Sequence, residues 1–128
     1  MKTQYTAALT LVTGVAIGAV AVQSLRAQAK PPAYVVVAIQ SITDPEGMNT
    51  IIKKASPGAL AAAGGHYVVR TSDAIGLEGA PPKRFVMIAF DNVEKARAWH
   101  DSPATKEITA IRVKSTDSIS YIVEGVAN

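Results

Sequence analysis

Four side chains with useful chemistry lie within a short stretch of this sequence. His66 begins an apolar run, and Arg70 ends it. Glu78 follows in a polar loop, and Arg84 begins the next apolar run. An imidazole titrates near neutral pH and can act as a general base, and a guanidinium can hold a carboxylate through two parallel hydrogen bonds. We therefore take these four as candidate ligand-binding residues, and His66 as the candidate catalytic base.

Each candidate also has a purely structural explanation. His66 could be an exposed residue at a strand end, and Glu78 could neutralise Arg70 or Arg84 in an ion pair. His100 could be a helix-end side chain whose charged form the helix dipole favours. Because the two histidines are far apart and lack carboxylates at ligand spacing, we predict no metal site. We also predict no cofactor, since the chain has no cysteine, phosphate loop or dinucleotide motif.

The elements that position these residues follow from the apolar pattern. Runs rich in β-branched and aromatic residues predict strands at 34–40, 66–71, 84–90 and 118–124. The middle two strands should form a hairpin, which brings Arg70 and Arg84 together across the loop at 72–83. Strand alternation predicts that His66, Val68 and Arg70 share one face. Residues 74–78 could add a short strand within the loop.

Capping residues and prolines mark the helices. Asp44-Pro45 and Ser102-Pro103 each place a capping side chain before a proline at the first helical position. Ser56-Pro57 interrupts the first helix, and Gly64-Gly65 ends it. Asp91 and Glu94 have the spacing of a capping box, which predicts Asp91 as the next cap. The order β-α-β-β-α-β predicts an α+β, ferredoxin-like fold, a four-stranded antiparallel sheet with helices on one face.

The uncovered face of this sheet predicts a partner. Helices can cover only one face, yet the first and third strands are apolar on both faces, as Val35 and Val36 illustrate. A sheet face that meets water normally shows polar residues at alternate positions. We therefore expect a homodimer that packs the two sheets together, which is the geometry of a dimeric α+β barrel. A domain of this modest size would also gain stability from the extra buried surface.

The first 29 residues have the composition of an export signal. Lys2 supplies a positive start, residues 7–22 are mostly apolar, and Ala27-Gln28-Ala29 fits the small-residue preference of signal peptidase. The apolar run is shorter than the ~20 residues of a membrane span. We predict a signal peptide at 1–29 cleaved after Ala29, a linker at 30–33 and a domain at 34–126. The product would be periplasmic or secreted and free of the membrane; the alternative is an uncleaved N-terminal anchor.

Removing the leader also changes the charge balance. The whole chain has 13 Lys and Arg against 10 Asp and Glu, a net charge of +3. Lys2 and Arg26 leave with the leader, so 13 − 2 = 11 cations face 10 anions and the net charge falls to +1. Because the remaining cations form pairs rather than a long stripe, we predict no nucleic-acid partner.

Several of these segments together resemble the domain of unknown function 1330 (DUF1330) family. The segments are 33–37, Thr43-Asp44-Pro45, 63–70, Leu77-Glu78-Gly79, 84–90, 94–99, Asp101-Ser102-Pro103, Arg112 and Val123-Glu124-Gly125. The resemblance spans nearly all of the domain and implies the dimeric α+β barrel fold without implying a chemistry. This chain departs from the family at Thr105, where the family usually has an aromatic residue, and in its leader.

The sequence thus supports an exported protein of unknown biochemical function, and the leading hypothesis is binding of a small organic acid or apolar ligand. The first alternative is a cofactor-independent enzyme of the monooxygenase or isomerase type that uses His66 as its base. The second is a structural or interaction module with no ligand. No motif in the sequence decides whether the protein is an enzyme.

Overall fold

The computed structural model describes residues 30–127, and the predicted signal peptide at 1–29 lies outside them. Within the described part, the strands are β1 (Ala33–Ile42), β2 (His66–Thr71), β3 (Arg84–Phe90) and β4 (Thr116–Glu124). The helices are α2 (Pro45–Lys54), α3 (Pro57–Ala62), α4 (Val93–Asp101) and α5 (Pro103–Ser115). None of these helices has the length and apolar character needed to cross a bilayer.

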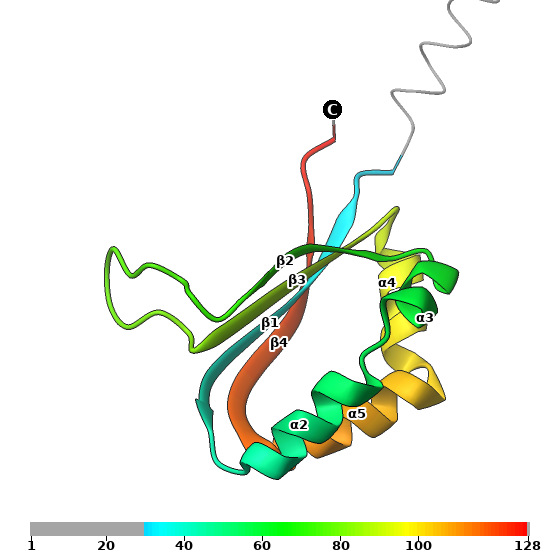
Figure 1. Cartoon of the computed structure of the whole chain (residues 1–128). Helices are drawn as coiled ribbons and strands as arrows, with labels where there is room; N and C mark the ends of the chain where they lie inside the picture. Colours follow the sequence, from blue (N-terminus) through cyan, green and yellow to red (C-terminus); the bar gives the residue numbers. More distant parts are fainter. Residues whose placement is uncertain (1–29, 128) are drawn as a thin grey trace, which may run out of the picture. The chain divides into compact units, whose positions relative to one another are not determined.

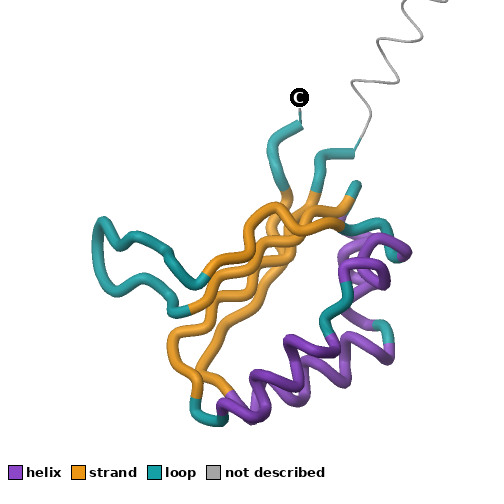
Figure 2. Tube along the Cα trace, in the orientation of Figure 1, coloured by secondary structure: helices purple, strands orange, loops and turns teal. Residues whose placement is uncertain are grey.

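The four strands form one antiparallel sheet in the order β2-β3-β1-β4. All the helices lie on one side of this sheet, and the other side is open (Figures 1 and 2). This order and the one-sided helices are those of a ferredoxin-like α+β fold, as the sequence predicts. The core therefore forms between the helices and one sheet face. Its buried members include Val35, Val37, Ile39, Met48, Ile51, Leu60, Ile88, Phe90 and Ala96.

Helix starts follow the capping residues, with one correction. Asp44, Ser56 and Ser102 cap α2, α3 and α5, each with a proline at the start of the helix. The cap of α4 is Asn92 rather than the predicted Asp91. Asn92 Oδ1 accepts a hydrogen bond of 2.9 Å from the Lys95 backbone amide, whereas the Asp91 carboxylate accepts one of 2.9 Å from Lys95 Nζ. Asp and Asn are equally good caps, so local preference did not separate these two neighbours.

The prediction that His66, Val68 and Arg70 share a face is wrong because β2 contains a bulge. Tyr67 pairs with Ile88 and Val69 pairs with Met87, which leaves Val68 as an extra residue without a partner. Since an extra residue restarts the alternation, Arg70 and Tyr67 lie on the same side of the strand. The guanidinium of Arg70 stacks over the Tyr67 ring, 4.7 Å from its centroid.

The loop at 72–83 contains no strand, so the possible short strand at 74–78 does not form. The loop extends away from the sheet on the side opposite the helices (Figure 1). Gly79 has a φ of 73°, a conformation that glycine adopts without strain. Two apolar side chains of the loop, Ile75 and Leu77, are almost fully exposed.

Candidate ligand-binding site

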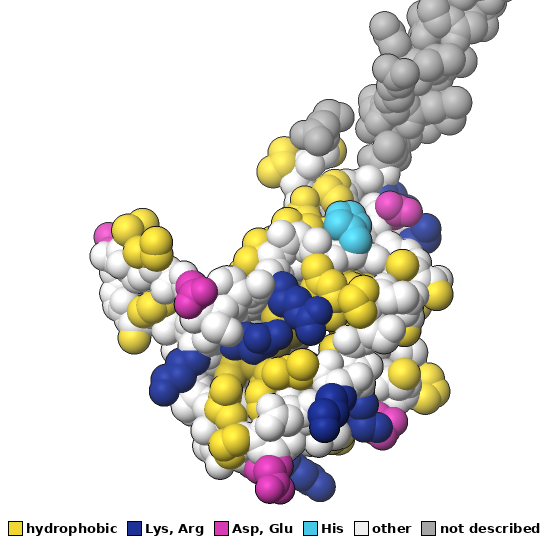
Figure 3. All heavy atoms as spheres, viewed as in Figure 1, with side chains coloured by type: hydrophobic (Ala, Val, Ile, Leu, Met, Phe, Trp, Pro, Cys, Tyr) yellow, Lys and Arg dark blue, Asp and Glu magenta, His cyan; other side chains and the backbone are white. Residues whose placement is uncertain are grey.

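A cavity of about 140 Å³ lies between the helix-covered face of the sheet and the helices. Its walls are formed by residues of α2, α3, α4 and α5 and of the strands β1, β2 and β3. Figure 3 shows its surroundings as a hollow in an apolar surface, with Lys and Arg side chains gathered around it. The apolar lining includes Val37, Ile39, Ile51, Leu60, Val86, Ile88, Trp99 and Ile108. The cavity therefore offers a mainly apolar interior with charged groups at its edge, which is typical of small-molecule sites.

Three arginines line this one cavity. Arg70 comes from the end of β2, Arg84 from the start of β3 and Arg112 from the last turns of α5. Arg70 is exposed, while Arg84 and Arg112 are half-buried. Burial lowers the pKa of Arg112 because an apolar surrounding disfavours the charged form. The fold thus concentrates positive charge at one cavity, although residues 30–128 together carry a net charge of only +1.

No ion pair neutralises these arginines within the described residues. The Arg70 guanidinium stacks over the Tyr67 ring, and Arg84 Nη1 donates one long hydrogen bond of 3.5 Å to Ser72 Oγ. Lys54, a fourth cation in the lining, differs because its Nζ lies 2.6 Å from Glu107 Oε1 on α5. The N–H donors of these three guanidinium groups, which no carboxylate of the described residues neutralises, can therefore bind an anion in the apolar space.

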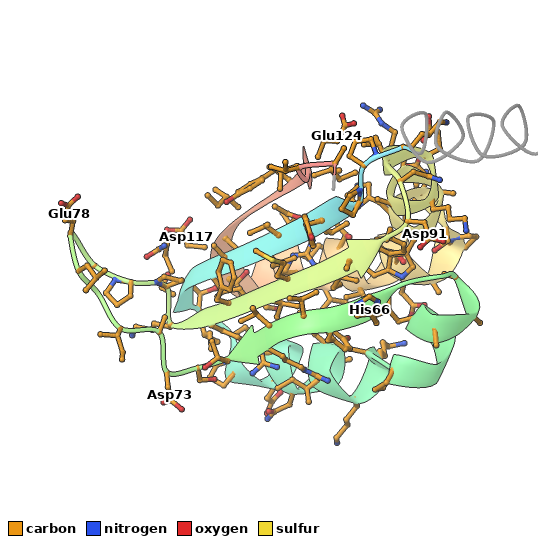
Figure 4. All side chains as sticks on the ribbon, turned by 90° about the horizontal axis from the view of Figure 1, so that it is seen from above. His66, Asp73, Glu78, Asp91, Asp117 and Glu124 are labelled. Carbon is orange, nitrogen blue, oxygen red and sulfur yellow. The ribbon has the colours of Figure 1, made fainter. Side chains whose placement is uncertain are left out.

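The structure brings together two of the four candidates. Arg70 and Arg84 both line the cavity, because the β2–β3 pairing places their strand ends side by side. Glu78 lies at the tip of the 72–83 loop and points away from both layers (Figure 4). It forms no ion pair with either arginine in the part of the chain that the structure describes.

His66 is exposed at the start of β2 and is not among the residues that line the cavity. Its surroundings are those of a surface group. The pKa of nearby Asp91 is lowered mainly by the hydrogen bond from Lys95 and by its charge, with a small further contribution from His66. Among the described residues there is no cluster of side chains suited to hold a metal ion.

Arg112 is the cavity arginine that was not among the four candidates predicted from the sequence. It follows Ala104 and Ile108 at intervals of four residues, and residues at this spacing share one face of a helix. A charged residue on an otherwise apolar helix stripe is the signal that could have identified it. Thr105 is also buried in the cavity wall.

The sheet order, the one-sided helices and this cavity define a ferredoxin-like α+β protein with a cationic pocket beneath its sheet. Residues 32–126 match the family described as Domain of unknown function (DUF1330), and the chain belongs to that family. This finding confirms the resemblance read from the sequence. No curated protein matches the chain significantly.

Solved structures with the same fold come from several organisms. The RPA0582 protein of unknown function from Rhodopseudomonas palustris is 14% identical, with a TM-score of 0.59 over 83% of this chain and 92% of that one. A dimeric ferredoxin-like protein of unknown function from Thermobifida fusca is 18% identical, with a TM-score of 0.55 over 74% and 92%. SnoaB, a cofactor-independent oxygenase from Streptomyces nogalater, is 12% identical, with a TM-score of 0.50 over 77% and 96%. At these identities the likeness establishes the fold alone.

Proposed function

We propose that this protein binds a small organic acid in the cavity between its sheet and its helices. The observation that carries the proposal is the set of three arginines around one apolar cavity, none of which pairs with a carboxylate of residues 30–127. The ligand would place its carboxylate among these arginines and its apolar part against the cavity wall. Neutral apolar molecules of the same size would bind more weakly because they leave the arginines without a partner.

The expected energetics follow from the burial of the cations. Arg84 and Arg112 are half-buried, so part of their hydration is already lost before a ligand arrives. A carboxylate that accepts hydrogen bonds from a guanidinium contributes about 1.5–3 kcal/mol per bond. That range corresponds to an affinity change of roughly 10- to 150-fold for each arginine removed.

Isothermal titration calorimetry with benzoate and hexanoate tests this proposal. Wild-type protein should bind both acids and should bind benzamide and hexanamide much more weakly. Arg84→Gln should weaken acid binding by roughly 10- to 150-fold. Arg97→Gln is the matched control, because Arg97 is exposed on α4 and outside the cavity, and it should bind like wild type. Equal affinity for acid and amide would contradict the proposal.

The enzyme alternative has one comparison in its favour, since SnoaB is described as a cofactor-independent oxygenase. A shared fold carries many unrelated activities, so the choice depends on the site. The candidate base His66 is exposed and lies outside the cavity, whereas the lining consists of apolar side chains, three arginines, Lys54, Tyr67 and two hydroxyl residues, Ser56 and Thr105. This arrangement is better suited to hold an anion than to remove a proton from one. We therefore favour binding over catalysis.

We further propose that two copies pair through the open face of the sheet. On that face β4 exposes Ile119, Tyr121 and Val123, whose exposed fractions are 61%, 46% and 41%. These three residues pair with Ala38, Val36 and Tyr34 of β1, so they form a continuous apolar strip along the sheet. The similar Thermobifida fusca protein is described as dimeric, which supports the same arrangement here.

Export of the domain remains our proposal, on the basis of the leader sequence. Mass spectrometry of the protein recovered from its native cells would test it. A mature N-terminus at Lys30 is expected after cleavage behind Ala29. A chain that still begins at Met1 would favour the anchored alternative.

A further inference from the structure

The register of the sheet gives the cavity a charged end and an apolar end. Along β3, Arg84 is opposite Ile39 of β1, Val86 is opposite Val37, and Phe90 is opposite Ala33. The β3 residues that line the cavity run from Arg84 to Ile88, four residues or about 13 Å along a strand, and Phe90 lies just beyond Ile88. Arg70 pairs with Val86, close to the arginine end.

Helix α5 runs along the same axis. Its last residue, Ser115, accepts hydrogen bonds from the backbone amides of Thr43 and Asp44, which follow the end of β1 next to Arg84. Arg112 therefore lies toward the arginine end of the cavity. Thr105 is seven residues earlier, about 10 Å back along the helix, and thus lies toward the Phe90 end. The positions of residues along β3 and along α5 therefore place the arginines at the same end of the cavity.

Trp99 and Thr105 stand at the apolar end. The Trp99 ring packs against Phe90, with the ring centroids 5.5 Å apart. Thr105 is buried, and its hydroxyl lies 3.0 Å from Ser102 Oγ. A second hollow next to this end shares Ala59, Trp99, Ala104 and Thr105 with the cavity. The two spaces thus have a common wall made of these four residues.

We propose that Trp99 and Thr105 close the inner end of the cavity and set the length of the ligand, which is a monocarboxylate with an apolar part of about one ring or six carbons. The size follows from the volume of about 140 Å³, because a cavity of about 150 Å³ holds one benzene molecule. The polarity fixes the orientation, with the carboxylate at the arginines and the tail against Trp99. This inference rests on the proposed binding of organic acids and adds the class and length of the acid.

Binding of a graded series of straight-chain acids, from acetate to decanoate, tests this inference by calorimetry. For wild type, affinity should rise about fourfold per methylene up to hexanoate and then stop rising. Because Trp99 is the chain's single tryptophan, its fluorescence provides a second signal. Hexanoate should change that fluorescence, whereas acetate, which is too short to reach the ring, should not.

Substitutions that open or narrow the shared wall should change the length of the best-binding acid in opposite directions. Trp99→Ala opens the wall toward the second hollow, so octanoate or decanoate should become the preferred acid. Thr105→Phe narrows the cavity at the same end, so butanoate should become preferred. Thr105→Val keeps the size of the side chain and should keep the optimum at hexanoate. If Trp99→Ala fails to fold because the Phe90 contact is lost, the two Thr105 variants still decide the question.

The outcomes distinguish a wrong end wall from a failure of acid binding itself. If wild type binds no acid in the series, organic-acid binding itself is wrong. If wild type binds acids but Thr105→Phe, and Trp99→Ala where it folds, keep its optimum, acid binding stands and the end wall is wrong. Opposite shifts in the two variants support both.

Discussion

The covered face and the open face of the sheet are made from alternate residues of the same strands. On β1, Val35, Val37 and Ile39 belong to the core under the helices, while Tyr34 and Val36 face the other way. Both faces are apolar, but only the covered face adds charge. Arg70, Arg84 and Arg112 surround its cavity, whereas β4 places Ile119, Tyr121 and Val123 on the open face.

This difference indicates two kinds of partner. A concave apolar space with unpaired cations fits a small anion, because a solute can enter it and neutralise the charge. A broad apolar strip without charge fits another protein surface, because exposed apolar patches of this kind mark interaction sites. The four predictions below challenge this assignment of a ligand to one face and a partner copy to the other.

The largest effect is expected on the open face, from Ile119→Asp. If two sheets pack there, the substitution places a charge in the middle of the interface, and the dimer dissociation constant should rise about 100-fold or more. Sedimentation equilibrium measures the change. Ser120→Asp is the matched control: Ser120 pairs with Val37 and lies on the other face, so this variant should remain dimeric. A dimer that survives Ile119→Asp would place the interface elsewhere.

The covered face should tolerate added volume poorly at the apolar end of the cavity. A Cβ at Gly65 would lie 2.7 Å from Phe90 Cε1 and 2.9 Å from Leu60 Cδ1. Gly65→Ala should therefore lower the free energy of unfolding by about 1–3 kcal/mol, which urea denaturation can measure.

Gly58 in α3 provides the control for this change. A Cβ there meets only Ser56 Oγ, at an ordinary 3.7 Å. Gly58→Ala should raise stability by up to about 1 kcal/mol, because alanine is the better helix former. Equal effects of the two substitutions would mean that packing around Gly65 is looser than the structure indicates.

Arg112 should show that the cationic end of the cavity costs stability. Its pKa is lowered by burial, so the charged side chain is held where water solvates it poorly. Arg112→Met should raise the free energy of unfolding by about 0.5 kcal/mol, a small gain because the group is partly exposed, and should weaken acid binding. Arg97→Met, on the exposed surface of α4, should change neither quantity. A loss of stability in Arg112→Met would assign Arg112 a structural role.

Much of the fold could be predicted because its boundaries have local causes. The bounds of β2 and β3 match the predicted strands to the residue, and prolines begin α2, α3 and α5 as expected. The bulge at Val68 could not be predicted in the same way. Tyr67, Val68 and Val69 are all good strand formers, so no change in pattern marks the extra residue.

The sequence predicted only that part of the candidate site which depends on the pairing of neighbouring strands. Arg70 and Arg84 line the same cavity because they lie near the end of β2 and at the start of β3, the two strands of one hairpin. Arg112 arrives from the other half of the chain, through packing of α5 beneath the sheet, and no rule of short-range spacing joins it to the other two. The Glu78 ion pair was plausible because the two strand ends of a hairpin approach each other, but the loop holds Glu78 at its tip, away from the sheet (Figure 4), and no ion pair joins it to either arginine within the described residues.

The smallest effect is expected from Asp91 and Lys95, which belong to neither face. Asp91 is exposed, and the hydrogen bond and charge of Lys95 lower its pKa. Because its folded pKa lies below its unfolded value of about 3.9, the pair contributes stability above that pH and loses it as the pH falls through the folded pKa. Asp91→Asn should therefore lower the melting temperature slightly at pH 7 and not at all at the acid end.

The pH profile distinguishes this surface pair from the residues of the two faces. Lys95→Met should give the same profile as Asp91→Asn, and the double variant should lose no more than either single one. Added salt should shrink the difference further, since exposed ion pairs are screened. If Asp91→Asn remained destabilising below the folded pKa, its effect would have to come from the start of α4, where Asn92 rather than Asp91 holds the cap.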